Sequence, residues 1–453
     1  MKKQNILILG IIATLSMGYL LTTKYYSTHF LPNTMIGNYD VSEKTLEEAE
    51  SYICSDIENS YVLEILCRNG KEYIEGNKIE YKISSNISQI WDQKNSYKWI
   101  ECLFRQDKHN LYYTVSYNED MLLREINSLK CVQEENMESP VDAYISEYRM
   151  GLGYEIIPEE KGTLLDKDKL IAVIKTAIKS AETELNIDNS NCYIEPGETK
   201  SSETLNEMLE KLNTVASANI TYKIGSMTKI LKADTFYQWI ITDDLGNISL
   251  NQDLLEEYVK SLAKETDTAY TKRNFMTTSG TVVKVEGPYG YRIDKNAEAE
   301  QLKNEILSGT QTEREPIYSM VGASREENDY GNTYVEIDLT NQMVYLYVDG
   351  NLIQSSKCVT GNVAKGHTTP PGIYPLTYKQ NDAVLRGPGY ASPVKFWMPF
   401  NGGIGLHDAS WRSSFGGNIY KTNGSHGCVN LPYDMAKTLY ENVYKGMPII
   451  CYN

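Results

Sequence analysis

The sequence predicts a multidomain chain: one apolar helix at the N-terminus, two modules that mix helices and strands, and a mostly-β domain at the C-terminus. Three observations support this. Residues 6–21 carry no charge, a weak repeat relates the middle of the chain to itself, and glycine and proline punctuate short apolar runs after about residue 320. A length of 453 residues allows about three domains.

The composition excludes several classes of protein. With 41% hydrophobic and 23% charged residues the chain resembles folded soluble domains, not disordered chains or polytopic membrane proteins. Lys+Arg 44 against Asp+Glu 60 gives a net charge of −16, which repels a phosphate backbone, so we expect no nucleic acid partner. The eight cysteines form no C-x-x-C pair, which argues against a zinc ribbon, and their spacing assigns no disulfide.

The N-terminal run has the charge pattern of a membrane anchor. Lys2 and Lys3 precede the apolar residues 6–21, and Lys24 follows them. Sixteen residues are short for a span, but Thr22 and Thr23 extend the run to eighteen. We expect residues 1–24 to be a cytoplasmic tip and a single anchor, with the remainder exported. A removed signal peptide and an ordinary buried helix are the alternatives, and the lack of an A-x-A site favours the uncleaved anchor.

The repeat has an offset of about 132 to 141 residues and keeps its order. The matched segments are Tyr81–Ile83 with Tyr222–Ile224, Tyr97–Ile100 with Tyr237–Ile240, Asn118–Leu122 with Asn251–Leu255, and Gly153–Ile156 with Gly290–Ile293. These matches predict two α+β modules, at residues 25–205 and 206–325. Matched tyrosines and tryptophans are more often shared core than shared ligand contacts, so cell-wall binding by these modules is a hypothesis.

Two helices in the first module can be placed from their starts. Ser42 or Thr45 precedes an acidic helical run, which is typical of a capped helix. Further on, Asp166 and Asp168 precede apolar residues with helical spacing, which are Leu170, Ile171, Ile174 and Ile178.

The last domain, residues 326–453, is expected to be mostly β. Strand-like segments at 334–339, 343–348 and 351–360 alternate with turns, and Asp349-Gly350 is a strong hairpin signal. The domain boundary is expected near Met320–Asn332.

The most unusual string in this domain is Ser425–Asn430 (SHGCVN), with His407 twenty-one residues before its cysteine. A free thiol, with a pKa of ~8.5, is only a few per cent thiolate at neutral pH, so a thiol nucleophile needs a base. We expect Cys428 to be the nucleophile and His407 its base, with the amides of Gly427 and Cys428 facing an oxyanion. Asp408 would orient the imidazole through either its carboxylate or its main-chain carbonyl.

Two other interpretations of these residues stay open. Cys428 and His407 could be a structural thiol and a core histidine. Alternatively, His407, His426 and Cys428 could hold zinc, although the His-x-Cys spacing is unusual for such a site.

Residues from about 332 to 453 resemble the catalytic domain of the L,D-transpeptidase (YkuD-like) family, the cysteine enzymes that cross-link bacterial peptidoglycan. The resemblance rests on Thr369–Tyr374 (TPPGIY), Ile404–His407 (IGLH) and the SHGCVN string, in the family's order. It implies a β-sandwich for this domain. More weakly, the two repeats are similar to the peptidoglycan-binding modules that precede this domain in some Gram-positive members.

The resemblance also implies a reaction. Cys428, activated by His407, would attack the third residue of a donor stem tetrapeptide and release D-Ala. An amine on an acceptor stem would then resolve the thioester, giving a cross-link between third-position residues. No cofactor or metal is implied, and carbapenems would acylate the cysteine. An L,D-carboxypeptidase with the same residues and a non-catalytic wall-binding scaffold are the competing functions. The acceptor's diamino acid and the oligomeric state stay open.

The resemblance suggests roles for the remaining site residues. Ser425 and His426 would shape the site, and Trp411, Tyr390 and Trp397 are candidates for the walls of the donor groove. Asn430 stands where many members carry an arginine that is assigned a substrate carboxylate, so that contact cannot be transferred. Asp408 also departs from the glycine or serine that often follows the base.

Overall fold

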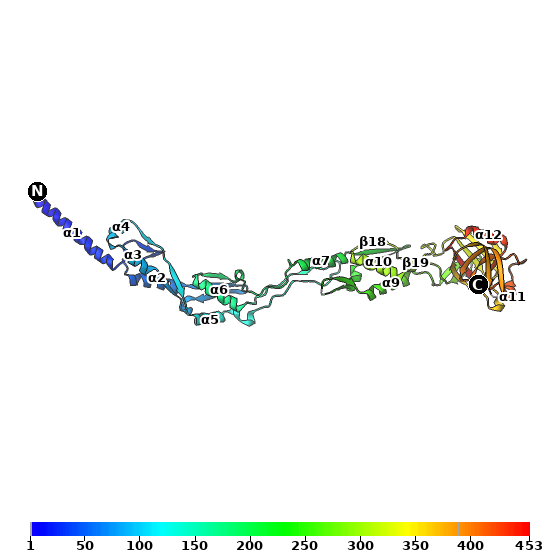
Figure 1. Cartoon of the computed structure of the whole chain (residues 1–453), viewed down its shortest axis with the longest axis horizontal. Helices are drawn as coiled ribbons and strands as arrows, with labels where there is room; N and C mark the ends of the chain where they lie inside the picture. Colours follow the sequence, from blue (N-terminus) through cyan, green and yellow to red (C-terminus); the bar gives the residue numbers. More distant parts are fainter. Residues whose placement is uncertain (1, 244, 388) are drawn as a thin grey trace. The chain divides into compact units, whose positions relative to one another are not determined.

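The computed structural model describes residues 2–243, 245–387 and 389–453 (Figure 1). The chain divides into two compact units. The first comprises the chain up to Ile145 together with Ile156–Leu205, and the second comprises Ser146–Glu155 and Asn206–Asn453.

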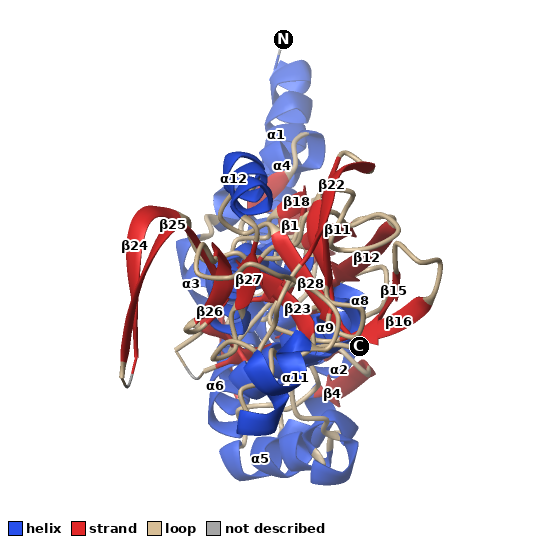
Figure 2. Ribbon diagram, turned by 90° about the vertical axis from the view of Figure 1, so that its right-hand side faces the viewer, coloured by secondary structure: helices blue, strands red, loops and turns tan. Residues whose placement is uncertain are grey.

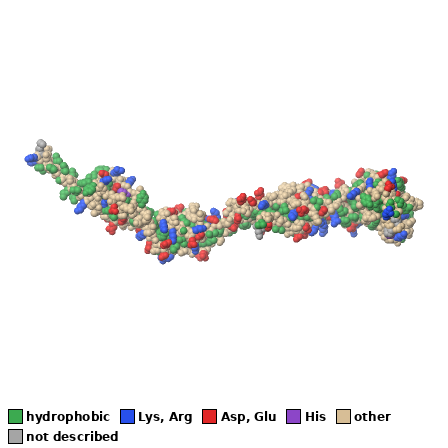
Figure 3. All heavy atoms as spheres, viewed as in Figure 1, with side chains coloured by type: hydrophobic (Ala, Val, Ile, Leu, Met, Phe, Trp, Pro, Cys, Tyr) green, Lys and Arg blue, Asp and Glu red, His purple; other side chains and the backbone are tan. Residues whose placement is uncertain are grey.

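Helix α1, Lys2–Ser27, contains the predicted apolar run and continues past it. In the described part of the chain it is the one helix that is long and apolar enough to cross a membrane, a property that signal sequences share. Hydrophobic side chains cover it in Figure 3. Two of its threonines form hydrogen bonds within the helix: the hydroxyls of Thr14 and Thr22 donate to the carbonyls of Gly10 and Gly18 at 2.9 and 3.0 Å. This satisfies polar groups that a hydrocarbon environment would leave unpaired.

The rest of the first unit has one core around Phe30, Ile53 and Ile87, another around Leu63, Ile126 and Ile174, and a small cluster that contains Leu31 and Cys102. The helix from Thr45 forms as predicted: Thr45 accepts from the amide of Glu48 and Glu48 accepts from that of Thr45. The elements of this unit after α1 are β1 Thr34–Ile36, β2 Tyr39–Asp40, α2 Leu46–Ser60, β3 Val62–Cys67, β4 Gly70–Glu75, β5 Lys82–Ser85, α3 Ile87–Gln93, α4 Trp99–Phe104, β6 Asp107–His109, β7 Tyr113–Ser116, α5 Glu119–Ser128, β8 Tyr144–Ile145, β9 Ile156–Ile157, α6 Lys167–Lys179 and β10 Glu184–Asn186.

The second α+β module lies in the second unit and repeats the sheet of the first. The sheets have the orders β10-β3-β4 and β12-β11-β18, each an antiparallel hairpin with a third strand parallel to its first strand. The elements of this module are α7 Glu203–Ala216, β11 Asn219–Ile224, β12 Met227–Lys232, α8 Ala233–Phe236, β13 Ile240–Thr242, β14 Ile248–Leu250, α9 Gln252–Thr266, β15 Arg273–Met276, β16 Val282–Val285, β17 Arg292–Ile293, α10 Lys295–Leu307, β18 Gln311–Arg314 and β19 Tyr318–Met320.

Helix caps carry the repeat most clearly. Asn118 and Asn251 accept from amides in the first turns of α5 and α9, and Asp166 and Asp294 do the same for α6 and α10. An N-cap oxygen satisfies an amide that has no partner in the helix, which is why these positions keep the same residue types in both modules.

Two of the four sequence matches join different elements. Tyr81–Ile83 leads into β5, whereas Tyr222–Ile224 lies in β11. Tyr97–Ile100 leads into α4, where Trp99 packs against a small separate cluster of Tyr26, Leu31 and Cys102, whereas Trp239 is buried in the core of the second module. The matches fail because the first module has additional elements. Helices α3 and α4 and strand β6 lie between its paired strands β5 and β7, whereas only residues 243–247 separate the corresponding strands β13 and β14.

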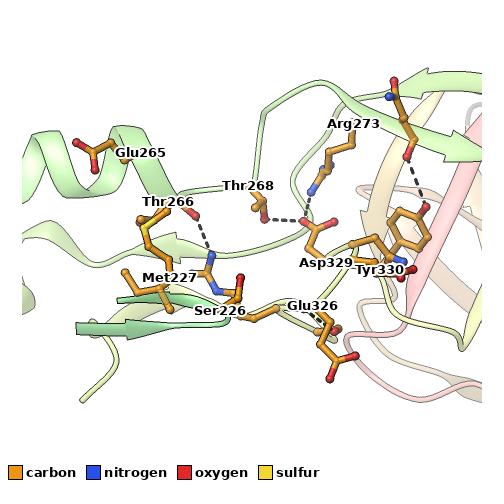
Figure 4. Close-up of a pocket in the computed structure, with 15 residues that line it drawn as sticks. Ser226, Met227, Glu265, Thr266, Thr268, Arg273, Glu326, Asp329 and Tyr330 are labelled. Carbon is orange, nitrogen blue, oxygen red and sulfur yellow. Dashed lines mark hydrogen bonds and ion pairs between the residues drawn. The ribbon is translucent and has the colours of Figure 1, made fainter. Parts of the chain in front are cut away.

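The second module continues into the last domain through shared contacts. Phe275 and Val285 pack with Ile373, Ile450 and Tyr452 in one apolar cluster. Beside it, Asp329 accepts from Thr268 and forms an ion pair with Arg273 (Figure 4).

The last domain consists of two sheets, with strand orders β22-β21-β20-β28-β23 and β24-β25-β26-β27. Its core includes Val344, Leu406 and Ile449 from both sheets and Leu439 from a helix, which confirms the sandwich. In Figure 2 the β24–β25 hairpin projects from the rest of the ribbon. The elements are β20 Tyr334–Asp338, β21 Met343–Val348, β22 Asn351–Lys357, β23 Gly372–Pro375, β24 Gln380–Gly387, β25 Tyr390–Asn401, β26 Ile404–Asp408, α11 Ile419–Asn423, β27 Val429–Leu431, α12 Tyr433–Asn442 and β28 Pro448–Tyr452.

The predicted hairpin at Asp349-Gly350 is confirmed. Strands β20, β21 and β22 form an antiparallel meander, and both turn residues have positive φ, 49° at Asp349 and 78° at Gly350. Two positive φ values are the geometry that favours Asp-Gly in a two-residue turn.

Candidate active site

Two adjacent parallel strands bring Cys428 and His407 to one place. His407 lies in β26, and Cys428 directly precedes β27. The register pairs Leu406 with Val429, so Cys428 is level with Gly405, two residues from His407 and therefore on the same face. Both residues line one cavity of about 410 Å³.

The imidazole of His407 is held by the main chain. It is 3% exposed, and its Nδ1 lies 2.8 Å from the carbonyl oxygen of Asp408. A carbonyl only accepts, so Nδ1 carries the proton, and Nε2 of the neutral ring is left as the basic nitrogen.

The carboxylate of Asp408 has a different task. It accepts from the amides of Lys395 and Phe396, both at 2.8 Å. The main-chain carbonyl of Asp408 therefore orients the imidazole of His407, and its carboxylate does not. The carboxylate instead binds the main chain of β25 beside β26.

Burial controls the protonation of the pair. It lowers the pKa of His407, against the opposing effects of the Asp408 carbonyl and carboxylate. It also raises the pKa of the Cys428 thiol, against a hydrogen bond from the Gly405 amide. Both shifts favour the neutral thiol and the neutral imidazole over a thiolate–imidazolium pair.

The turn before Cys428 is built from Ser425 and Gly427. Gly427 has φ 120°, which disfavours other residues, and an added Cβ would lie 3.2 Å from the side chain of Ile404. The Gly427 amide donates to the Ser425 hydroxyl at 3.0 Å, and that hydroxyl donates to the Cys428 carbonyl. This differs from the expectation that the Gly427 amide faces an oxyanion: in the resting structure the serine already occupies it.

Thr369, from the TPPGIY segment, supports the same turn. Its buried hydroxyl donates to the Gly427 carbonyl at 2.7 Å and accepts from the Gly361 amide at 3.1 Å. The sequence placed Thr369 in a family motif without a role, and the structure gives it this contact.

The remaining predicted residues divide between the cavity and the core. Ser425, His426 and Trp411 line the cavity, and Trp411 is half exposed, with its ring centroid 5.9 Å from that of His407. Trp397 is buried in a small cluster against Cys428, with its ring centroid 6.0 Å from that of His407, and it is not among the described residues that line the cavity.

Asn430 and Tyr390 complete the set of predicted substrate-binding residues. Asn430 lines the cavity but is buried, and within the described part of the chain its Oδ1 has no hydrogen-bond partner. The side chain of Tyr390 lies outside the described part of the structure.

Arg412 also lines the cavity, and no sequence pattern pointed to it. Arginines are usually solvated surface residues, and nothing in the local string SWRSS separates this one from that majority.

A second cavity, of about 480 Å³, lies near the Arg273–Asp329 ion pair (Figure 4). Its described lining includes Met227, Thr266 and Tyr330 but neither cysteine nor histidine, so it lacks the thiol and the imidazole found in the first cavity.

Comparisons with known proteins agree with this location. Residues 332–451 match the family model of the L,D-transpeptidase catalytic domain, and residues 200–314 match that of a candidate peptidoglycan-binding domain. No curated protein matches the chain.

Several solved structures are similar. A crystal structure of an Enterococcus faecium L,D-transpeptidase mutant is 32% identical, covering 54% of this chain and 100% of that chain, with a TM-score of 0.46. An NMR structure of the catalytic domain of the E. faecium enzyme acylated by ertapenem is 39% identical over 27% and 98% of the two chains, with a TM-score of 0.25. A structure of L,D-transpeptidase 3 from Mycobacterium tuberculosis is 18% identical over 27% and 60%, with a TM-score of 0.24.

Proposed function

Because the chain belongs to the L,D-transpeptidase family, we propose that it cross-links peptidoglycan stem peptides through a thioester on Cys428. The observation that carries this proposal is the pair in one cavity: a thiol and an imidazole whose Nδ1 is fixed by the Asp408 carbonyl. A fixed Nδ1 proton leaves Nε2 as the base, which acyl transfer by a neutral thiol requires.

In the first half-reaction Cys428 attacks the carbonyl of the third residue of a donor tetrapeptide. A C–S bond forms while Nε2 of His407 takes the thiol proton. The intermediate collapses with cleavage of the C–N bond, and His407 returns the proton to the departing amine of D-Ala. The Cys428 amide is the main-chain donor that we propose for the oxyanion, since the Gly427 amide is held by Ser425.

In the second half-reaction an amine of the acceptor stem attacks the thioester. His407 takes a proton from the attacking nitrogen and gives it to the leaving sulfur. The products are an amide cross-link between third-position residues and the free enzyme.

We further propose that α1 is a single-pass anchor and that the modules and the last domain lie outside the membrane, facing the cell wall. The apolar length of α1 and the match of residues 200–314 to a candidate peptidoglycan-binding domain support this location. The domain limits that we propose are 1–24, 25–205, 206–325 and 326–453.

Product analysis tests the function. The chain without its first 27 residues is incubated with tetrapeptide muropeptides, and the products are identified by mass. Transpeptidation predicts cross-linked dimers with loss of one D-Ala per dimer. Tripeptides without dimers would instead identify an L,D-carboxypeptidase, and unchanged tetrapeptides would leave a wall-binding scaffold.

Carbapenem acylation follows from the same site. The E. faecium catalytic domain is acylated by ertapenem, and we propose that Cys428 is acylated in the same way.

A further inference from the structure

The catalytic cavity contains a cation, the guanidinium of Arg412, that forms no ion pair with the described residues. Among the described residues that line it, Arg412 has the one permanently charged side chain. The chain as a whole carries 60 acidic and 44 basic residues, so a cavity with a single positive charge runs against the overall balance.

The guanidinium of Arg412 is only partly satisfied. Nη1 donates to the carbonyl of Asn423 at 3.0 Å, while Nε is buried and has no hydrogen-bond partner within the described chain. No carboxylate of the described residues lies within ion-pair distance of it. Burial therefore acts on this charge unopposed and lowers the pKa of Arg412.

The backbone fixes Arg412 beside the base. The Ala409 amide donates to the Leu431 carbonyl, and the Arg412 amide donates to the Ala409 carbonyl, both at 3.0 Å. This turn follows β26 directly, and it keeps the guanidinium close enough to His407 to lower the pKa of the imidazole.

Leaving the buried Nε of a charged guanidinium without a hydrogen-bond partner is costly, and a bound carboxylate would offset that cost with charge-assisted hydrogen bonds. We propose that Arg412 binds the free carboxylate at the end of the donor peptide, one residue beyond the bond that Cys428 cleaves. The identity of the peptide rests on the proposed function, but the preference of the cavity for a carboxylate does not.

This assignment gives Arg412 a role in positioning and selectivity. A donor whose terminal carboxylate is held at Arg412 has its penultimate carbonyl fixed relative to the sulfur. A donor that ends in a carboxamide loses the charge and binds more weakly.

Two small alkylating agents test the preference without any peptide substrate. Iodoacetate and iodoacetamide have nearly the same size and differ in charge. We measure the rate of modification at Cys428 for each reagent by peptide mass analysis, at pH 7, and take the ratio of the two rates. Arg412→Gln is expected to lower the iodoacetate-to-iodoacetamide ratio about tenfold relative to the parent, and Arg412→Lys should restore part of it.

Lys437→Gln is the matched control. It removes one positive charge from α12 of the same domain, at a residue that does not line the cavity, so the ratio should stay as in the parent. A thermal unfolding curve confirms that each variant is folded.

The outcomes separate the two proposals. An unchanged ratio in a folded Arg412→Gln protein overturns the carboxylate site, whatever the enzyme does to muropeptides. A lowered ratio in a chain that forms neither dimers nor tripeptides keeps the site and rejects the transpeptidase function. With peptide donors, the parent should discriminate against the terminal carboxamide by an increase in KM of about tenfold, and Arg412→Gln should lose that discrimination.

Discussion

The proton on the Cys428 sulfur is the feature on which the chemistry depends. Burial opposes charge on both members of the pair, raising the pKa of the thiol and lowering that of the imidazole. A cysteine enzyme with a preformed thiolate–imidazolium pair would have the opposite shifts. We infer that the base acts during the attack and not before it.

A pH profile of the reaction at Cys428 checks this inference. The active form needs neutral His407, whose pKa lies below the usual value of 6.5, so activity should be retained on acidification to below pH 6.5. The rate of modification by iodoacetamide should rise with pH through a midpoint below 6.5 and then stay level until the thiol ionises, above pH 9. A thiolate–imidazolium pair would instead give a rise in the acid range near the pKa of a lowered thiol, about 3 to 4. Alkylation followed at Cys428 over pH 3 to 10 distinguishes the two.

The sequence singled out Cys428 and His407 because their types and order are restrictive, and the structure places both in one cavity. A cysteine in a glycine-containing turn, with a histidine at the end of an apolar strand, indicates a thiol nucleophile and its base. It could not assign hydrogen bonds, because these depend on the path of the main chain. The Asp408 carbonyl and carboxylate are examples: they share a residue number, but only the fold shows that one meets His407 and the other meets β25. The hydrogen bond from the Gly427 amide to the Ser425 hydroxyl is another example.

At the scale of elements, the second module is stabilised by a buried charge network between α10 and β18. Arg314 of β18 forms ion pairs with Glu298 and Glu305 of α10, at 2.8 and 2.9 Å, and the hydroxyl of Tyr222 donates to Glu298 at 2.6 Å. The side chain of Glu298 is fully buried, so water screens its ion pair with Arg314 only weakly. Such a network is most sensitive to the loss of one partner.

Arg314→Met tests the network. It leaves the Glu298 carboxylate buried without its cation, which should cost about 3–5 kcal/mol of local stability. Hydrogen exchange of the β11 amides measures this loss in the module itself. Lys223→Met is the control, because its pair with Glu313 is exposed and 3.7 Å long, and its effect should be at most about 1 kcal/mol. A loss below that size for Arg314→Met would show that the network does not stabilise the module.

Element starts were the most predictable part of the modules. Thr45 and Asp166 cap helices as the sequence indicated, because a capping side chain acts within three residues of its own position. Long-range equivalence was less predictable. Short similar strings such as Tyr-Lys-Ile lie in different strands of the two modules, because the first module has additional helices between β5 and β7.

The whole chain combines an apolar N-terminal helix, repeated α+β modules and a sandwich that contains Cys428. The sequence predicted the order of these three parts because each part has its own pattern. The patterns are an uncharged run, a repeat with helix caps, and short strands between turns. The pattern does not give the product of the reaction, since the acceptor is a second molecule and its site has no signature in the sequence.

The central claim is that the sulfur of Cys428 carries the peptide during transfer. The most direct measurement is the intact mass of the chain without its first 27 residues after mixing with a donor tetrapeptide, for the parent and for Cys428→Ala. We predict an added mass equal to the donor without D-Ala on the parent, no addition on Cys428→Ala, and no cross-linked muropeptides from that variant. A folded Cys428→Ala protein that still forms dimers as fast as the parent would show that the sulfur of Cys428 does not carry the peptide.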